Sequence, residues 1–155
     1  MAAPVMNRVV AAFKAQATGD QLIQSKALRG RKIVIYFYPK DATPGCTTEG
    51  QDFRDLFAKF RRQNALIFGV SRDSLASHEK FKKKHKFSFD LISDPDEKLC
   101  RQFDVIKEKS LYGRKFMGIE RSTFLIDEDG KLRAEWRKVK VKGHADEVLA
   151  AVKNC

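Results

Sequence analysis

The stretch that decides the fold is Lys32-Ile33-Val34-Ile35-Tyr36-Phe37-Tyr38-Pro39. Its first seven residues form an almost unbroken run of β-branched and aromatic side chains, which is typical of a strand buried on both faces of a sheet. Pro39 ends the run because proline has no backbone N–H to donate to a neighbouring strand. Residues 32–38 are therefore predicted to form a central strand.

A helix is expected after this strand, beyond the loop of residues 40–42. Phe53, Leu56, Phe57 and Phe60 fall at i, i+3, i+4 and i+7, which places them on one apolar stripe facing a core. The chain then continues to alternate between strands and helices. The predicted elements are a buried strand at 65–70, a basic helix that opens at Ser74 with His78, Phe81 and His85 inward, a short strand at 89–92 and a helix that starts over 95–100.

The last third of the chain contains a predicted hairpin and a closing helix. Residues 122–126 and 131–138 flank the turn Asp127-Glu128-Asp129-Gly130, and the helix begins near His144. Residues 1–31 contain turn signals at Gly19-Asp20 and Arg29-Gly30, with short strands or a frayed end between them. The pattern predicts an α/β three-layer sandwich with a mixed central β-sheet flanked by helices, in a single domain over residues 1–155 whose first 12 residues are frayed.

Composition excludes several classes of protein. The chain has 155 residues, of which 43% are hydrophobic and 33% charged, so it is not of the disordered or low-complexity type. No apolar run approaches the roughly 18–20 residues of a membrane span, and we expect no membrane association. Three cysteines without CxxC spacing and three histidines outside any metal-ligand pattern predict no metal site, and the chain is expected in a reducing cytoplasm.

The residues that could perform chemistry follow the central strand, in Thr43-Pro44-Gly45-Cys46-Thr47-Thr48-Glu49. Thr43 suits a helix N-cap and Pro44 the first helical position, so Cys46 is expected in the first turn. The positive end of a helix favours a negative sulfur, and thiols there can become reactive thiolates. The alternative from these residues alone is an ordinary small side chain at a helix start.

A family resemblance favours the reactive thiol. Pro39, Thr43 and Cys46 stand in the P-x-x-x-T-x-x-C signature of peroxiredoxins. The longer string over residues 36–49 resembles the bacterioferritin comigratory protein (PrxQ) subfamily, as do residues 69–74, 91–94 and 119–127. The likeness covers roughly residues 10–153, which is nearly the whole chain.

The resemblance implies a thioredoxin-like fold and an antioxidant enzyme, a thiol-dependent peroxidase of hydrogen peroxide and organic hydroperoxides that serves cell redox homeostasis. Cys46 matches the cysteine that attacks peroxide and becomes a sulfenic acid. Thr43 matches a threonine that contacts the thiolate and the peroxide, and Arg121 matches an arginine beside the sulfur. Pro39 matches a proline that shields the pocket from water, and Glu49 matches a residue that supports the arginine. No prosthetic cofactor is implied, only an external thiol reductant such as thioredoxin, glutaredoxin, glutathione or a small thiol.

The chain departs from the subfamily where a second thiol usually resolves the sulfenic acid. The two usual positions, one in the same helix and one in the next, fall at Gln51 and Lys82. Cys100 is predicted to be a buried apolar residue, and Cys155 at the chain end could reach another subunit or have no role. A one-cysteine mechanism with an external thiol is therefore expected.

Two other classes of function stay open from the residues. The lysines of residues 80–86, with Arg61 and Arg62 and a net charge of +11, allow nucleic-acid binding through phosphate contacts. No nucleic-acid motif accompanies them, so a solvated face and no specific nucleic-acid partner are expected. A catalytically silent thioredoxin-fold binding module is the other alternative, and the four residues Pro39, Thr43, Cys46 and Arg121 argue against it. We expect a monomer.

Overall fold

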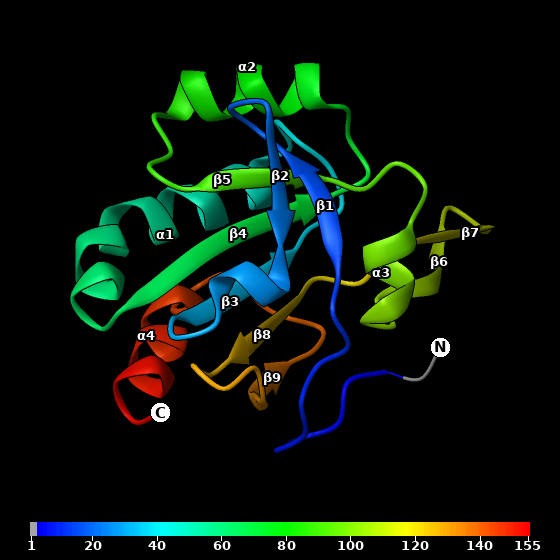
Figure 1. The fold of residues 1–155 in the computed structure, drawn as a ribbon. Helices are drawn as coiled ribbons and strands as arrows, with labels where there is room; N and C mark the ends of the chain where they lie inside the picture. Colours follow the sequence, from blue (N-terminus) through cyan, green and yellow to red (C-terminus); the bar gives the residue numbers. More distant parts are fainter. Residues whose placement is uncertain (1–2) are drawn as a thin grey trace.

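A seven-stranded mixed sheet forms the centre of the protein, in a computed structural model that describes residues 3–155 (Figure 1). Its strands are β1 (Lys14–Ala17), β2 (Gln21–Gln24), β3 (Lys32–Phe37), β4 (Ala65–Ser71), β5 (Asp90–Ser93), β8 (Ser122–Ile126) and β9 (Leu132–Trp136). The helices are α1 (Pro44–Arg62), α2 (Leu75–His85), α3 (Lys98–Gln102) and α4 (His144–Lys153), with a 3-10 turn over Ser25–Leu28.

The strand order is β2-β1-β5-β4-β3-β8-β9, with β3 in the interior. β3 pairs in parallel with β4 and antiparallel with β8, which confirms the predicted mixed sheet. All six residues of β3 are buried, as the apolar run predicts. The pairing of Phe37 with Ser122 sets the carboxyl end of β3 beside the start of β8.

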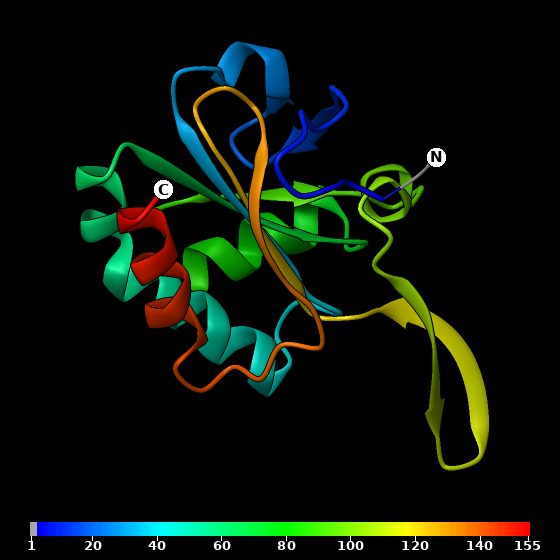
Figure 2. The same cartoon turned by 90° about the horizontal axis from the view of Figure 1, so that it is seen from below.

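Two apolar clusters lie on opposite faces of the sheet. Along β3 the side chains alternate, so Ile33, Ile35 and Phe37 enter one cluster and Val34 and Tyr36 the other. Helices α1, α2 and α4 pack over the second cluster, while α3 and the N-terminal segment cover the first (Figure 2). The three-layer architecture is therefore confirmed.

Most predicted elements are present within a residue or two of their expected bounds, and two predictions need correction. Helix α3 starts at Lys98 rather than at Pro95, because Glu97 adopts a left-handed conformation with φ 62°. Residues 6–10 are not frayed. Met6 and Val9 form bridges with Leu132 and Lys131, and the Val10 N–H donates to Gly130; residues 1–2 of that prediction lie outside the described residues.

A two-stranded ribbon was not predicted. Strands β6 (Ile106–Leu111) and β7 (Arg114–Ile119) pair antiparallel and project from the body of the protein (Figure 2). Their turn holds Tyr112 and Gly113 at φ 50° and 78°, the left-handed pair that a two-residue hairpin turn requires. Charged side chains at Lys107, Glu108 and Lys109 interrupt the apolar pattern by which buried strands are found in a sequence.

Candidate active site

Cys46 lies in the first turn of α1, where the sequence predicts it. Thr43 has the extended conformation of an N-cap residue, with φ −81° and ψ 154°, and Pro44 follows at the start of the helix. The side chain of Cys46 faces the apolar cluster beneath α1, and the residue is only 2% exposed. A small molecule reaching this sulfur enters a site that is largely shielded from water.

Arg121 reaches Cys46 from the other side of the site. The residue directly precedes β8, and the pairing of Ser122 with Phe37 brings it to the carboxyl end of β3. Its Nη2 donates a hydrogen bond to Cys46 Sγ over 3.4 Å. Gly45 permits this approach, because a Cβ at that position would lie 3.2 Å from Nη2. A fixed positive charge beside the sulfur favours its negative form.

Glu49 holds the other branch of the same guanidinium. Arg121 Nη1 donates to Glu49 Oε1 over 2.6 Å, and Glu49 is 1% exposed. Burial raises the pKa of Glu49 to about 7, although the charge of Arg121 and its hydrogen bond lower it. Burial lowers the pKa of Arg121, but Glu49 and Cys46 outweigh this and leave it raised. Among residues 3–155, Glu49 Oε2 and the Tyr36 hydroxyl have no hydrogen-bond partner.

Thr43 and Pro39 flank the loop that leads into α1. The Thr43 hydroxyl donates to the Lys40 carbonyl oxygen over 2.8 Å, so its hydrogen is used within the loop rather than on Cys46 Sγ. Its carbonyl oxygen accepts from the Thr47 N–H. Pro39 is half-buried where the chain leaves β3. The structure therefore brings Cys46 and Glu49 to the same guanidinium of Arg121, while Thr43 and Pro39 belong to the loop that leads into α1.

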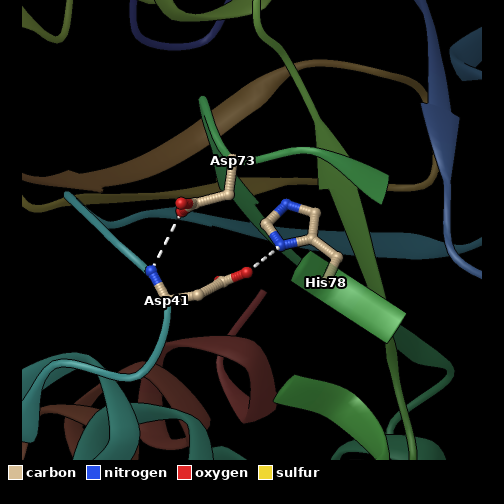
Figure 3. Close-up of side chains that lie close together, drawn as sticks. All are labelled: Asp41, Asp73 and His78. Atoms are coloured by element: carbon tan, nitrogen blue, oxygen red, sulfur yellow. Dashed lines mark hydrogen bonds and ion pairs between the residues drawn. The ribbon is translucent and has the colours of Figure 1, made fainter. Parts of the chain in front are cut away.

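A second polar cluster is formed by Asp41 of this loop together with Asp73 and His78 (Figure 3). His78 Nδ1 donates to Asp41 Oδ2 over 2.7 Å, and Nε2 faces the Ile92 carbonyl oxygen at 2.9 Å. Because both neighbours are hydrogen-bond acceptors, both ring nitrogens are assigned as donors. Asp73 Oδ2 already accepts from the Asp41 N–H and the Ser71 hydroxyl, so the three side chains form a hydrogen-bond network.

The other two cysteines are remote from Cys46, and all three are free thiols. Cys100 belongs to the apolar cluster on the opposite face of the sheet and is 0% exposed. Burial, followed by the nearby Asp94, raises the pKa of the Cys100 thiol well above its usual range. Cys155 lies just beyond α4, whose Val152 carbonyl accepts from Lys32 at the start of β3. The active-site loop is at the other end of that strand.

Sequence reasoning missed several neighbours of the site. The sequence predicts Asp41 in a loop and His78 on the inner face of a helix, and their pairing across 37 positions leaves no local signal. On the ribbon, burial and then the charge of Arg121 lower the pKa of Lys109, while Cys46 acts in the opposite direction. Alternating lysines before a Tyr112-Gly113 turn are the signal by which this ribbon could have been found.

Comparisons with known proteins agree with this geometry. A family model described as the AhpC/TSA family matches residues 6–135. Peroxiredoxin Bcp of Xanthomonas campestris is 60% identical over 128 residues, which are 83% of this chain and 80% of that protein. The Xylella fastidiosa PrxQ structure has a TM-score of 0.93 and 42% identity, covering 99% of this chain and 98% of that one. A structure of X. campestris bacterioferritin comigratory protein, titled for its alkyl peroxide reduction activity, has a TM-score of 0.88 and 54% identity over 92% and 90% of the two chains.

The fold and the similar proteins thus define an enzyme of the thioredoxin-like class, a thiol-dependent peroxidase. Within that class, the chain belongs to the AhpC/TSA family and, more closely, to the Bcp or PrxQ peroxiredoxins. These enzymes use thiol reductants rather than a prosthetic cofactor. Within residues 3–155 no helix combines the length and apolar character that crossing a membrane requires.

Proposed function

We propose that Cys46 is the residue that attacks peroxide in this enzyme. Its thiolate would bond to the terminal oxygen of the peroxide while the O–O bond breaks, giving a sulfenic acid on Cys46. The leaving oxygen takes a proton and departs as water or an alcohol. The observation that carries this proposal is the hydrogen bond of 3.4 Å from Arg121 Nη2 to Cys46 Sγ at the start of α1.

The neighbouring residues would divide the remaining work. Arg121 stabilises the thiolate and the charge that develops on the leaving oxygen. Glu49 orients the guanidinium through its bond to Nη1. Pro39 shields the sulfur from water, and Thr43 contacts the thiolate and the peroxide. This last role requires the Thr43 hydroxyl to turn away from the Lys40 carbonyl when substrate binds.

We further propose a one-cysteine mechanism. Gln51 and Lys82 occupy the two usual positions of a resolving cysteine, and both side chains have other partners here. Gln51 Nε2 lies 3.4 Å from His85 Nδ1, and Lys82 Nζ forms an ion pair of 2.7 Å with Asp90. Position 82 therefore stabilises the C-terminal half of α2 instead of providing a thiol.

The placement of the other thiols supports the same mechanism. The sheet separates Cys100 from Cys46, because the two residues belong to clusters on opposite faces. Lys32 contacts both Val152 near Cys155 and Asn64 just after α1, so Cys155 lies toward the C-terminal end of α1. From Cys46 to that end, at Arg62, the helix spans about 24 Å. An internal disulfide to either one would require extensive unfolding.

Regeneration would then depend on an outside thiol. A first thiolate attacks the sulfenic acid, forms a mixed disulfide and releases water, and a second thiol frees Cys46. Thioredoxin, glutaredoxin, glutathione or a small thiol could serve. The substrates would be hydrogen peroxide and organic hydroperoxides, in line with the alkyl peroxide activity named for the X. campestris relative. The three free cysteines fit a single-domain monomer in a reducing cytoplasm.

The test is to expose the reduced protein to one equivalent of hydrogen peroxide and to analyse it by intact and peptide mass spectrometry with a sulfenic-acid trap. We expect the trapped adduct on Cys46 and no disulfide. The Cys46→Ser protein is the control for the trap. A disulfide from Cys46 to Cys100 or Cys155 would refute the one-cysteine mechanism while keeping the peroxidase. If Cys46 stayed reduced, the assignment of this residue would be wrong.

A further inference from the structure

Asp41 anchors the loop between β3 and α1. Its buried carboxylate accepts three hydrogen bonds: from the Tyr38 hydroxyl over 2.6 Å, from the Ser77 hydroxyl over 2.8 Å and from His78 Nδ1 over 2.7 Å. Its backbone N–H donates to Asp73 Oδ2 over 2.9 Å (Figure 3). Both the main chain and the side chain of Asp41 are therefore fixed in position.

Two of the three donors belong to the first turn of α2, so the contacts join the loop to that helix. His78 is 0% exposed, and its second ring nitrogen donates to Ile92 in β5. Each ring nitrogen therefore donates to an acceptor, and Nδ1 donates to the Asp41 carboxylate. Burial raises the pKa of Asp41, but the hydrogen bonds from His78 and Tyr38 outweigh it and hold this pKa below its ordinary value. A buried carboxylate held by hydrogen bonds is sensitive to the loss of any of its donors.

We infer that Asp41 and His78 are positioning residues for the peroxide reaction: their pair holds the loop of residues 39–43 against α2, and thereby holds Pro39 and Thr43 in place beside Cys46. This inference rests on the proposed role of Cys46. Pro39 and Thr43 lie two residues either side of Asp41, so a shift of Asp41 moves both. Displacement of a reacting group by about 1 Å can lower a rate about a hundredfold.

The chain offers a matched control in Asp90. Its carboxylate also accepts from three side chains, Thr18, Gln21 and Lys82, and it also anchors α2, although at the C-terminal half. Asp90 is in β5, away from the active-site loop. A role in the stability of α2 is therefore common to Asp41 and Asp90, whereas contact with the loop belongs to Asp41 alone.

The experiment compares Asp41→Asn with Asp90→Asn in two reactions of reduced Cys46: oxidation by hydrogen peroxide and alkylation by iodoacetamide. For Asp41→Asn we expect oxidation to slow by about 10- to 100-fold, while alkylation stays equal or becomes faster because the loop opens. For Asp90→Asn we expect both rates within about twofold of the wild type, with a loss of thermal stability similar to that of Asp41→Asn.

Tyr38→Phe and Ser77→Ala each remove one donor to Asp41. If Asp41→Asn does not fold, these two variants test the positioning role in its place. We expect each to slow oxidation by about 2- to 10-fold without slowing alkylation. Equal losses in both reactions, equal effects of Asp41→Asn and Asp90→Asn, or wild-type oxidation rates in the donor variants would overturn the inference. A wild-type Cys46 that does not react with peroxide would instead overturn the proposed function.

Discussion

Cys46 and Cys100 occupy the same place in two different helices. Each is the third residue of its helix, α1 or α3, and each is almost completely buried. The charges around them are opposite. Arg121 donates to Cys46 Sγ, whereas the Asp94 carboxylate lies against Cys100 and accepts from its backbone N–H over 2.7 Å.

With Cys46 as the proposed nucleophile, this comparison implies that a helix start does not by itself make a cysteine reactive. The first turn of α3 is capped by Asp94, which accepts from the N–H groups of Leu99 and Cys100. In the described part of the chain, α1 has no side-chain cap at Thr43, so its first N–H groups remain available to a substrate. The sign of the neighbouring charge and the free helix end distinguish the two thiols.

The strongest test of this difference is to replace each cysteine by serine. We expect Cys46→Ser to lose peroxidase activity by at least about a thousandfold, since a hydroxyl does not replace the nucleophile. Cys100→Ser should retain activity because its side chain faces the other side of the sheet. Peroxide consumption with dithiothreitol measures both. Comparable losses in the two variants would mean that the thiols are not different in function.

Removal of the positive charge of Arg121 is expected to have the next largest effect on the oxidation rate of Cys46. Arg121→Gln should slow the oxidation of Cys46 by about 10²- to 10³-fold, as for other lost donors to a developing charge. Arg121→Lys should give a smaller loss, because it keeps the charge but loses the fork that joins Cys46 to Glu49. Stopped-flow oxidation at several pH values is the measurement. Identical rates for the two variants would argue against the role of the charge.

Because the pKa of Glu49 is raised, we expect the free energy of unfolding to depend on pH. With a pKa raised to about 7 in the folded protein, Glu49 binds more protons folded than unfolded between about pH 4.5 and pH 7. Its contribution to the free energy of unfolding is therefore present at low pH and is lost as the pH rises through about 7, by at most about 3 kcal/mol. Glu49→Gln lacks this term, so its stability relative to wild type should increase from pH 5 to pH 8 in urea unfolding. A constant difference would contradict the raised pKa.

The smallest effect on activity is expected from a substitution of Asp94, beside Cys100. Asp94→Asn weakens the cap of α3 and should lower the free energy of unfolding by about 1 kcal/mol. The peroxide rate of Cys46 should stay within about twofold of wild type, because the Asp94 carboxylate bonds to the start of α3 on the opposite face of the sheet. Urea unfolding and stopped-flow oxidation give the two numbers. A large loss of rate would show that the two faces are coupled.

Local sequence patterns were sufficient for most of the fold. The apolar run of β3, the stripe of α1 and the turn at residues 127–130 each depend on neighbours in the chain. The start of α3 could not be placed because it depends on the conformation of Glu97 and on the Asp94 carboxylate. The ribbon was missed because its side chains are exposed and carry no burial pattern.

The site was only partly accessible to the same reasoning. The cap and the proline placed Cys46 at a helix start, but Arg121 is 75 positions away and reaches the sulfur only through the register of β3 and β8. A family resemblance supplied that residue. The pairing of Asp41 with His78 depends on the docking of α2 against the loop, and no local pattern of residues indicates it.

The position of Cys155 has a practical consequence. This half-buried thiol lies near the start of β3, and the active-site loop leaves the far end of the same strand. While Cys46 is blocked reversibly as a mixed disulfide, and with Cys100 buried in the interior, Cys155 is a single attachment point for a dye, a tether or a solid support. Enzyme fixed in this way would present its peroxide-binding side to the solution in a uniform orientation.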